Sequence, residues 1–187
     1  MVLGWFGKVA PVGARLHDAL CALLLAVALL AAPAIARADD ADPEPDALAF
    51  GAGWFDIVKQ RNNAAILNLE YRSDKKLWVF KPMFGMFATS EGGFYGYAGI
   101  RMDVYFGNRF VFTPSFAPGF YHNGNGKDLG FDIEFRSSGE FAYRFDDYSR
   151  LSLGLAHLSN ASLGSKNPGV ETLTLSYSVP FSKLLGD

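Results

Sequence analysis

Three polar residues near the end of the chain are of the types used in nucleophilic catalysis. The sequence reads His157-Leu-Ser159-Asn160-Ala161, and Glu171 follows on the next strand-like run. Serine is a weak nucleophile until an imidazole takes its proton, and a carboxylate can hold that imidazole in the required tautomer. The three residues could therefore act as nucleophile, base and orienting acid. Asn160 could donate an amide hydrogen bond to a developing oxyanion.

Each of these residues also has an ordinary structural interpretation. A serine at the end of a strand is usually a turn residue, and Asn160 and Asn167 suit a loop. A single histidine at a membrane interface is often an amphipathic anchor. Serine, histidine and glutamate occur together in many sequences, so their spacing alone does not define a triad. The strands and loops that carry these residues must decide between the catalytic and the structural interpretation.

Alternation of period two dominates the chain after residue 46, and no stretch shows the period of a helix. Eight runs of this kind are found, at 47–55, 63–72, 77–88, 94–106, 110–121, 131–145, 151–160 and 170–179. Several are longer than strands of soluble sheets and reach the roughly 9–11 residues that a tilted strand needs to cross a bilayer. The pattern predicts eight antiparallel strands.

The phase of the alternation indicates which environment each face meets. One parity of the run 131–145 is apolar and the other is charged. The first comprises Phe131, Ile133, Phe135, Phe141, Tyr143 and Phe145, and the second comprises Asp132, Glu134, Arg136, Glu140 and Arg144. An apolar outside around a charge-paired interior is typical of a transmembrane β-barrel, whose closure leaves no unpaired backbone in lipid. A soluble, lipocalin-like barrel with the faces reversed is the alternative.

The candidate residues fall on the outward parity of their strands. His157 and Ser159 share a face with Leu151, Leu153 and Leu155, and Glu171 shares one with Leu173, Leu175 and Tyr177. Antiparallel pairing through the intervening loop would bring Glu171 beside the strand that carries His157. A carboxylate and an imidazole that face lipid are energetically costly unless they hydrogen-bond to each other or take part in catalysis.

The N-terminal residues 1–38 have the three parts of a secretory signal peptide. Lys8 and Arg15 precede an apolar block at 19–32, and Ala36-x-Ala38 fits a cleavage site before Asp39. The block is short for a transmembrane helix, so an uncleaved anchor is the weaker alternative. An acidic, unstructured leader follows at 39–46, and the barrel occupies 47–187. The single cysteine, Cys21, leaves with the signal peptide, so no disulfide can stabilise the barrel.

Composition excludes two classes of protein. Of the 187 residues, 50% are hydrophobic and 15% aromatic, and the formal net charge is only -2. Such a chain is too apolar and too weakly charged to be disordered. No basic stripe stands out against a pI of about 5.9, which argues against binding to nucleic acid. No set of histidine, cysteine and carboxylate residues has the spacing of metal ligands.

The motif His157-Leu-Ser159-Asn160-Ala161, followed by Asn167-Pro168-Gly169-Val170-Glu171, resembles the signature of the lipid A 3-O-deacylases (PagL type) of Gram-negative outer membranes. The resemblance implies that Ser159 is the nucleophile, His157 the base and Glu171 the orienting acid, with Asn160 and Asn167 supporting the oxyanion or the substrate. It further implies a barrel in the outer membrane that hydrolyses the 3-O-linked acyl ester of lipid A in lipopolysaccharide of the outer leaflet, without metal or cofactor.

The sequence leaves other functions and assemblies open. A small non-catalytic outer-membrane barrel with a structural or adhesive role is the main alternative, and it would make the shared parity of His157, Ser159 and Glu171 a coincidence. A soluble periplasmic lipid-binding barrel is a third. The sequence leaves a homodimer open, and it does not reveal which acyl chains are preferred.

Overall fold

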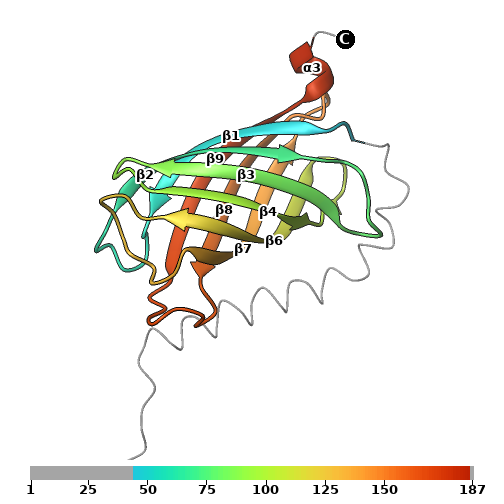
Figure 1. Ribbon diagram of the computed structural model, residues 1–187. Coiled ribbons are helices and arrows are strands. Elements are labelled where there is room, and N and C mark those ends of the chain that lie inside the picture. The colour runs from blue at the N-terminus through green and yellow to red at the C-terminus, as the bar shows by residue number, and fades with distance from the viewer. Residues whose placement is uncertain (1–43, 186–187) are drawn as a thin grey trace, which may run out of the picture.

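A closed antiparallel barrel makes up almost all of the part described by the computed structural model, residues 44–185 (Figure 1). Its strand segments are β1 (Ala47–Phe55), β2 (Ala64–Arg72), β3 (Lys81–Thr89), β4 (Phe94–Arg101), β5 (Val104–Phe106), β6 (Phe110–His122), β7 (Ile133–Arg144), β8 (Arg150–Ser159) and β9 (Val170–Pro180). Strands adjacent in sequence pair in order, β1 pairs with β9, and the β4–β6 pairing completes the barrel. The alternating runs thus correspond to a continuous wall.

The segments β4 and β5 are two parts of one strand. β4 pairs with β6 from Phe94↔His122 to Arg101↔Ser115, and β5 continues the same register from Val104↔Phe112 to Phe106↔Phe110. Between them, the Met102 N–H still donates to the Pro114 carbonyl. The wall therefore has eight strands, and the predicted eight-stranded antiparallel β-barrel is confirmed.

One end of the barrel carries two short turns and the longer 73–80 connection, and the other carries four loops. Gly107, at φ 65°, begins the short β5–β6 connection, and Asp147 accepts from the backbone N–H of Ser149 in the β7–β8 connection, as expected for turns of this composition. We call this the turn end. The opposite, loop end carries the connections 56–63, 90–93, 123–132 and 160–169.

The β2–β3 connection differs from the tight turn predicted at Ser73-Asp74. Strand β3 begins at Lys81, whereas the sequence predicted a strand from Leu77. Leu77 and Phe80 instead pair with each other in an isolated bridge around Trp78, which adopts φ 64°. This local turn takes up the residues that alternation alone assigned to the strand.

The outer wall is apolar and the interior is polar, as the alternation predicted. Exposed side chains on the strands include Phe50, Trp54, Leu67, Phe84, Phe116, Phe141 and Leu153. Buried charged side chains include Glu70, Arg72, Lys81, Arg101, Asp103, Glu134 and Arg150. A soluble barrel would bury the first set and expose the second, so the alternative with reversed faces is wrong.

Ion pairs fill the interior. Arg72 donates from both terminal nitrogens to Glu140, at 2.7 Å each, and from Nε to Glu70 at 2.7 Å. Asp103 accepts from Arg101 at 2.5 Å and from Arg150 at 3.2 Å. A cavity among the charges around Arg72 measures about 10 Å³, room for roughly one water molecule. The barrel is therefore filled rather than hollow.

Both described termini lie at the turn end. Glu44 pairs with Arg144 at 2.7 Å and also with Arg150, so the last residues of the predicted 39–46 leader contact the barrel interior. After β9, the short helix α3 (Phe181–Leu185) stands at the end opposite to the 160–169 loop (Figure 1). The predicted signal peptide, 1–38, lies outside the described residues. Within 44–185, no helix is long and apolar enough to cross a membrane.

Candidate active site

Strand β8 places His157 and Ser159 on the outer wall. Along this strand the residues Leu151, Leu153 and Leu155 are exposed, while the alternate positions are buried. His157 and Ser159 continue the outward parity and are partly buried. They lie roughly 7 Å apart along the strand, on one face and at the loop end. The predicted orientation of both side chains is confirmed.

Glu171 lies directly across from His157 on β9. The two residues are partners in the β8–β9 ladder, and Nδ1 of His157 is 3.1 Å from Oε1 of Glu171. Their side chains are only 12% and 15% exposed, respectively. A carboxylate on Nδ1 fixes the tautomer that carries its proton on that nitrogen, and so leaves Nε2 for proton transfer. The pair gives Nδ1 of His157 and Oε1 of Glu171 a polar partner on a wall that otherwise faces lipid.

Gly169 allows the loop to close against the His157 ring. Its φ is +58°, a conformation that glycine adopts without strain. A Cβ atom built on Gly169 would lie 2.9 Å from Cε1 of His157. Any larger residue at this position would therefore push on the imidazole. The glycine holds the backbone in direct contact with the base.

Asn160 is the first residue of the 160–169 loop, and its side chain is fully buried. Its Nδ2 donates to the carbonyls of Leu129 and Lys166, each at 2.9 Å, and its Oδ1 accepts from the N–H of Ser162 at 2.9 Å. From the sequence, a direct role at the oxyanion is predicted for this amide. In the structure both of its hydrogens bind loop carbonyls on the inner side, because Asn160 has the parity opposite to Ser159.

Asn167 lies at the other end of the same loop and is exposed. Its Oδ1 accepts from the backbone N–H of Asn160 at 3.2 Å. Since a backbone N–H can only meet the oxygen of the amide, this bond determines which way the side chain points. The Nδ2 group of Asn167 is thereby turned away from Asn160 and remains available as a donor.

Two other loops hold the candidate site in place. The Ile57 N–H donates to the Glu171 carbonyl at 3.2 Å, and Lys59 donates to the Pro168 carbonyl. Lys127 Nζ is 2.6 Å from Asp56 Oδ1, which joins the 123–132 loop to the 56–63 loop. The sequence does not point to these lysines, because contacts between distant loops leave no periodic signal.

Asp56 is the buried anchor of this arrangement. Burial by itself would raise the pKa of Asp56, but the hydrogen bond from Lys127 and those from the N–H groups of Asn62 and Arg61 hold the pKa below its usual value. A carboxyl whose pKa is lowered on folding contributes stability above its unfolded pKa of about 4 and loses it as the pH falls through the folded value. The connection between the loops is therefore fully formed at neutral pH.

The remaining histidine of the described chain, His122, is exposed at the end of β6, apart from the pair at His157. In the part of the chain from 44 to 185, no group of three or more histidine, cysteine, aspartate and glutamate side chains could hold a metal ion.

The chain is similar to known proteins in both sequence and fold. The family model described as lipid A 3-O-deacylase (PagL) matches residues 50–180. Among solved structures, that of the outer membrane enzyme PagL gives a TM-score of 0.57 at 17% identity, covering 72% of this chain and 99% of that one. A de novo designed transmembrane β-barrel gives 0.52 at 8% identity, covering 74% and 97%. No curated protein matches the sequence. The two solved structures bear on the fold alone, while the family match covers well over half of the chain.

Proposed function

The chain belongs to the lipid A 3-O-deacylase (PagL) family of outer-membrane β-barrels, and from this premise we propose that it hydrolyses the 3-O-linked acyl ester of lipid A with Ser159, His157 and Glu171. The observation that carries the proposal is the 3.1 Å contact between His157 and Glu171 on the outward face, with Ser159 next on the same face. The loop end then faces the cell exterior, where the outer leaflet holds lipid A.

The residues have the roles expected of a serine esterase. Ser159 Oγ attacks the ester carbonyl while its proton passes to Nε2 of His157. Glu171 accepts from the Nδ1–H and stabilises the imidazolium that forms. The tetrahedral intermediate collapses to an acyl-serine, and His157 returns the proton to the departing sugar hydroxyl. A water molecule, deprotonated by His157, then releases the fatty acid and restores Ser159.

The two asparagines have separate tasks in this proposal. Nδ2 of Asn167 donates to the oxyanion, because its Oδ1 already accepts from the Asn160 N–H. Asn160 is a positioning residue that holds the loop by binding the carbonyls of Leu129 and Lys166. One donor to an oxyanion is typically worth about 3 kcal/mol of transition-state stabilisation.

The outward position of the site suits an acyl chain that stays in the membrane. Leu155, Leu153 and Leu151 continue from His157 along the outer wall towards the turn end. A substrate lipid can lie against this row with its ester beside Ser159. The ester then needs neither to leave the leaflet nor to enter the filled interior.

Purified protein, folded in detergent and incubated with lipid A, tests the proposal. The wild-type protein is expected to release a 3-hydroxy fatty acid, measured by mass spectrometry, and Ser159→Ala to release at least about 1,000-fold less. Ser165→Ala, in the same loop but outside the proposed triad, is the matched control and should retain activity. A wild-type protein that releases no acyl chain would instead support the non-catalytic barrel. The homodimer stays a prediction, since the structure is of a single chain.

A further inference from the structure

A buried carboxyl lies on the inner face of the wall, behind the candidate site. Glu134 is the second residue of β7 and is 0% exposed. The register Phe135↔Ser159, extended by one residue, brings Glu134 across from Asn160, which is also fully buried. The two side chains are therefore neighbours inside the barrel, one residue from the proposed nucleophile on the outer face.

Neither oxygen of the Glu134 carboxyl has a hydrogen-bond partner. Within residues 44–185 it is the only buried carboxyl of which this is true. Two tyrosines lie near it, but their hydroxyl groups donate to backbone carbonyls. Tyr95 donates to the carbonyl of Glu134 itself at 2.9 Å, and Tyr121 donates to that of Lys127 at 2.8 Å. Neither hydroxyl hydrogen is left for the carboxyl.

The basic residues of the adjoining segments also have other partners. Lys127 Nζ is 2.6 Å from Asp56 Oδ1, and Arg136 donates to Ser138 at 2.9 Å. The charged and titratable groups of the segments packed around Glu134 are Tyr95, Tyr121, Lys127, Asp128, Asp132, Arg136 and Asp56. In the described part of the chain none of them pairs with Glu134, so a negative charge here would be buried without a counter-ion, at far greater cost than a neutral carboxyl.

The Asn160 amide approaches the same carboxyl from the loop. Both hydrogens of this amide already bind the Leu129 and Lys166 carbonyls, at 2.9 Å each. A carboxylate is a stronger acceptor than a peptide carbonyl, so an ionised Glu134 would draw the amide away from one of them. The observed hydrogen bonds are those expected beside a neutral carboxyl.

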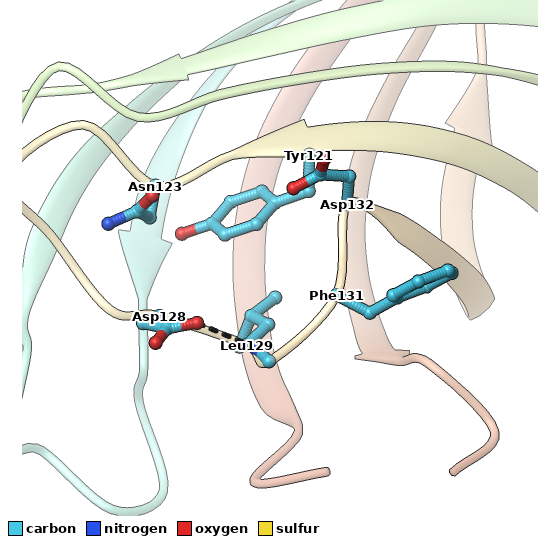
Figure 2. Close-up of a pocket in the computed structure, with 7 residues that line it drawn as sticks. Tyr121, Asn123, Asp128, Leu129, Phe131 and Asp132 are labelled. Atoms are coloured by element: carbon cyan, nitrogen blue, oxygen red, sulfur yellow. Dashed lines mark hydrogen bonds between the residues drawn. The ribbon is translucent and has the colours of Figure 1, made fainter. Parts of the chain in front are cut away.

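The loop next to Glu134 is hollow, which gives the proton a route to solvent. A pocket of about 280 Å³ opens there, and Tyr121, Leu129 and Asp132 are among the residues that line it (Figure 2). Asp132 precedes Glu134 by two residues. The pocket has room for water, so the protonation of Glu134 can follow the pH outside the barrel.

We propose that Glu134 is a positioning residue whose proton holds the proposed catalytic loop in place. Neutral Glu134 leaves Asn160 bound to the Leu129 and Lys166 carbonyls. When Glu134 passes its proton to water, the carboxylate accepts from Asn160 Nδ2 instead, and the loop that follows Ser159 loosens. The inference rests on the proposed function and adds a control of the outer site by a single proton inside the barrel.

The pH dependence of hydrolysis tests the proposal. In the wild type, kcat for lipid A should rise as His157 becomes neutral and fall again as Glu134 ionises, within about pH 6 to 9. Glu134→Gln is neutral at every pH and has nearly the same shape, so it should lack the fall. At about pH 9 its kcat should exceed that of the wild type about 10- to 100-fold, the effect expected when Asn160 keeps its bonds.

Two controls accompany this measurement. The Ser159→Ala protein gives the spontaneous hydrolysis of the ester at each pH, which is subtracted. Glu91→Gln removes an exposed acid at the same end of the barrel and should keep the pH profile of the wild type. The same profile in Glu134→Gln and the wild type would overturn the proposal.

Two further measurements require no hydrolysis. In an ester-free detergent at about pH 6, where exposed carboxyls are ionised, the wild type should show the infrared C=O absorption of a protonated carboxyl and lose it by about pH 9. Hydrogen exchange in the 160–169 loop, corrected for its intrinsic pH dependence, should accelerate over the same range in the wild type and not in Glu134→Gln. Absence of the absorption, or equal exchange in both proteins, would contradict the proposal. A protein that shows both effects but releases no fatty acid would contradict only the proposed function.

Discussion

His157 and Glu171 are cross-strand partners on the outer wall, and their side chains meet at 3.1 Å between Nδ1 and Oε1. The strands that build the wall therefore also set the distance between base and carboxylate. No loop needs to close to bring them together. The acid–base pair of the proposed mechanism is assembled when the β8–β9 hairpin forms.

Replacing Glu171 by glutamine tests the pair directly. A neutral amide can donate to Nδ1 and so favour the wrong tautomer of His157, while the shape of the side chain is kept. We expect Glu171→Gln to lower kcat by about 100- to 10,000-fold at unchanged thermal stability. Release of fatty acid from lipid A measures kcat, and circular dichroism on heating measures thermal stability. Activity within a few-fold of the wild type would remove Glu171 from the mechanism.

The asparagines of the 160–169 loop should respond differently to the same substitution. In Asn160→Asp, the new carboxylate cannot donate to the Leu129 and Lys166 carbonyls, so the loop should loosen. We expect faster hydrogen exchange in the 160–169 loop and a decrease in kcat of about 10- to 100-fold. In Asn167→Asp, the oxygen that accepts from the Asn160 N–H remains, but the donor to the oxyanion is lost. We expect unchanged exchange and a decrease in kcat of about 100- to 1,000-fold. Unchanged exchange in Asn160→Asp would contradict its positioning role.

Gly169→Ala and Gly107→Ala form a matched pair. Both glycines have positive φ, at +58° and +65°, so alanine should cost each about 1 kcal/mol of folding free energy. Only at Gly169 does the added Cβ meet the His157 ring, since nothing lies within 4 Å of the Cβ position at Gly107. We therefore expect a loss of stability in both variants, larger in Gly169→Ala, and a loss of esterase activity in Gly169→Ala alone. Equal activities would show that the imidazole has room to move.

The interior ion pairs should matter for stability and not for catalysis. Arg72→Met leaves Glu70 and Glu140 without their shared partner inside the barrel, which should cost about 3–5 kcal/mol of unfolding free energy. Lys183→Met removes a pair with Asp147 whose two side chains are both exposed, and should change stability little. Denaturant titration in detergent measures both variants. Below the unfolding transition, kcat of Arg72→Met should equal that of the wild type.

Leu153→Arg tests the orientation of the wall in lipid. Leu153 is exposed in the middle of β8, and an arginine near the midplane of a bilayer destabilises a barrel by about 2–4 kcal/mol. Leu77→Arg, in the exposed β2–β3 connection, is the control and should cost much less. Reversible unfolding in vesicles gives both values. Equal effects would place Leu153 outside the hydrocarbon layer.

Alternation predicted the wall well because each strand has two faces in unlike environments. In β7, aromatic residues such as Phe141 alternate with charges such as Glu140, so its length and orientation follow from the sequence. The same reasoning assigned His157 and Glu171 to the outside and predicted their pairing across the hairpin. It was wrong about the start of β3, where Leu77 pairs with Phe80 instead of continuing a strand.

The loop contacts could not be predicted in this way. The sequence suggested either a loop residue or an oxyanion donor for Asn160, although its parity already pointed inward. The carbonyl of Leu129 that it binds comes from a distant connection, and nothing periodic links the two positions. The pairing of Glu44 with Arg144 was missed for the same reason, since an acidic stretch with prolines is typical of an unstructured leader.

A site on the outer surface of a barrel wall, as proposed for His157 and Ser159, meets its substrate by lateral diffusion in two dimensions. The quantity that governs its rate is then the mole fraction of substrate in the leaflet rather than its amount per volume. Diluting lipid A with an inert lipid or detergent, at a constant bulk concentration of lipid A, should slow hydrolysis. Other lipids in the leaflet should compete with lipid A for contact with the outer surface of the barrel.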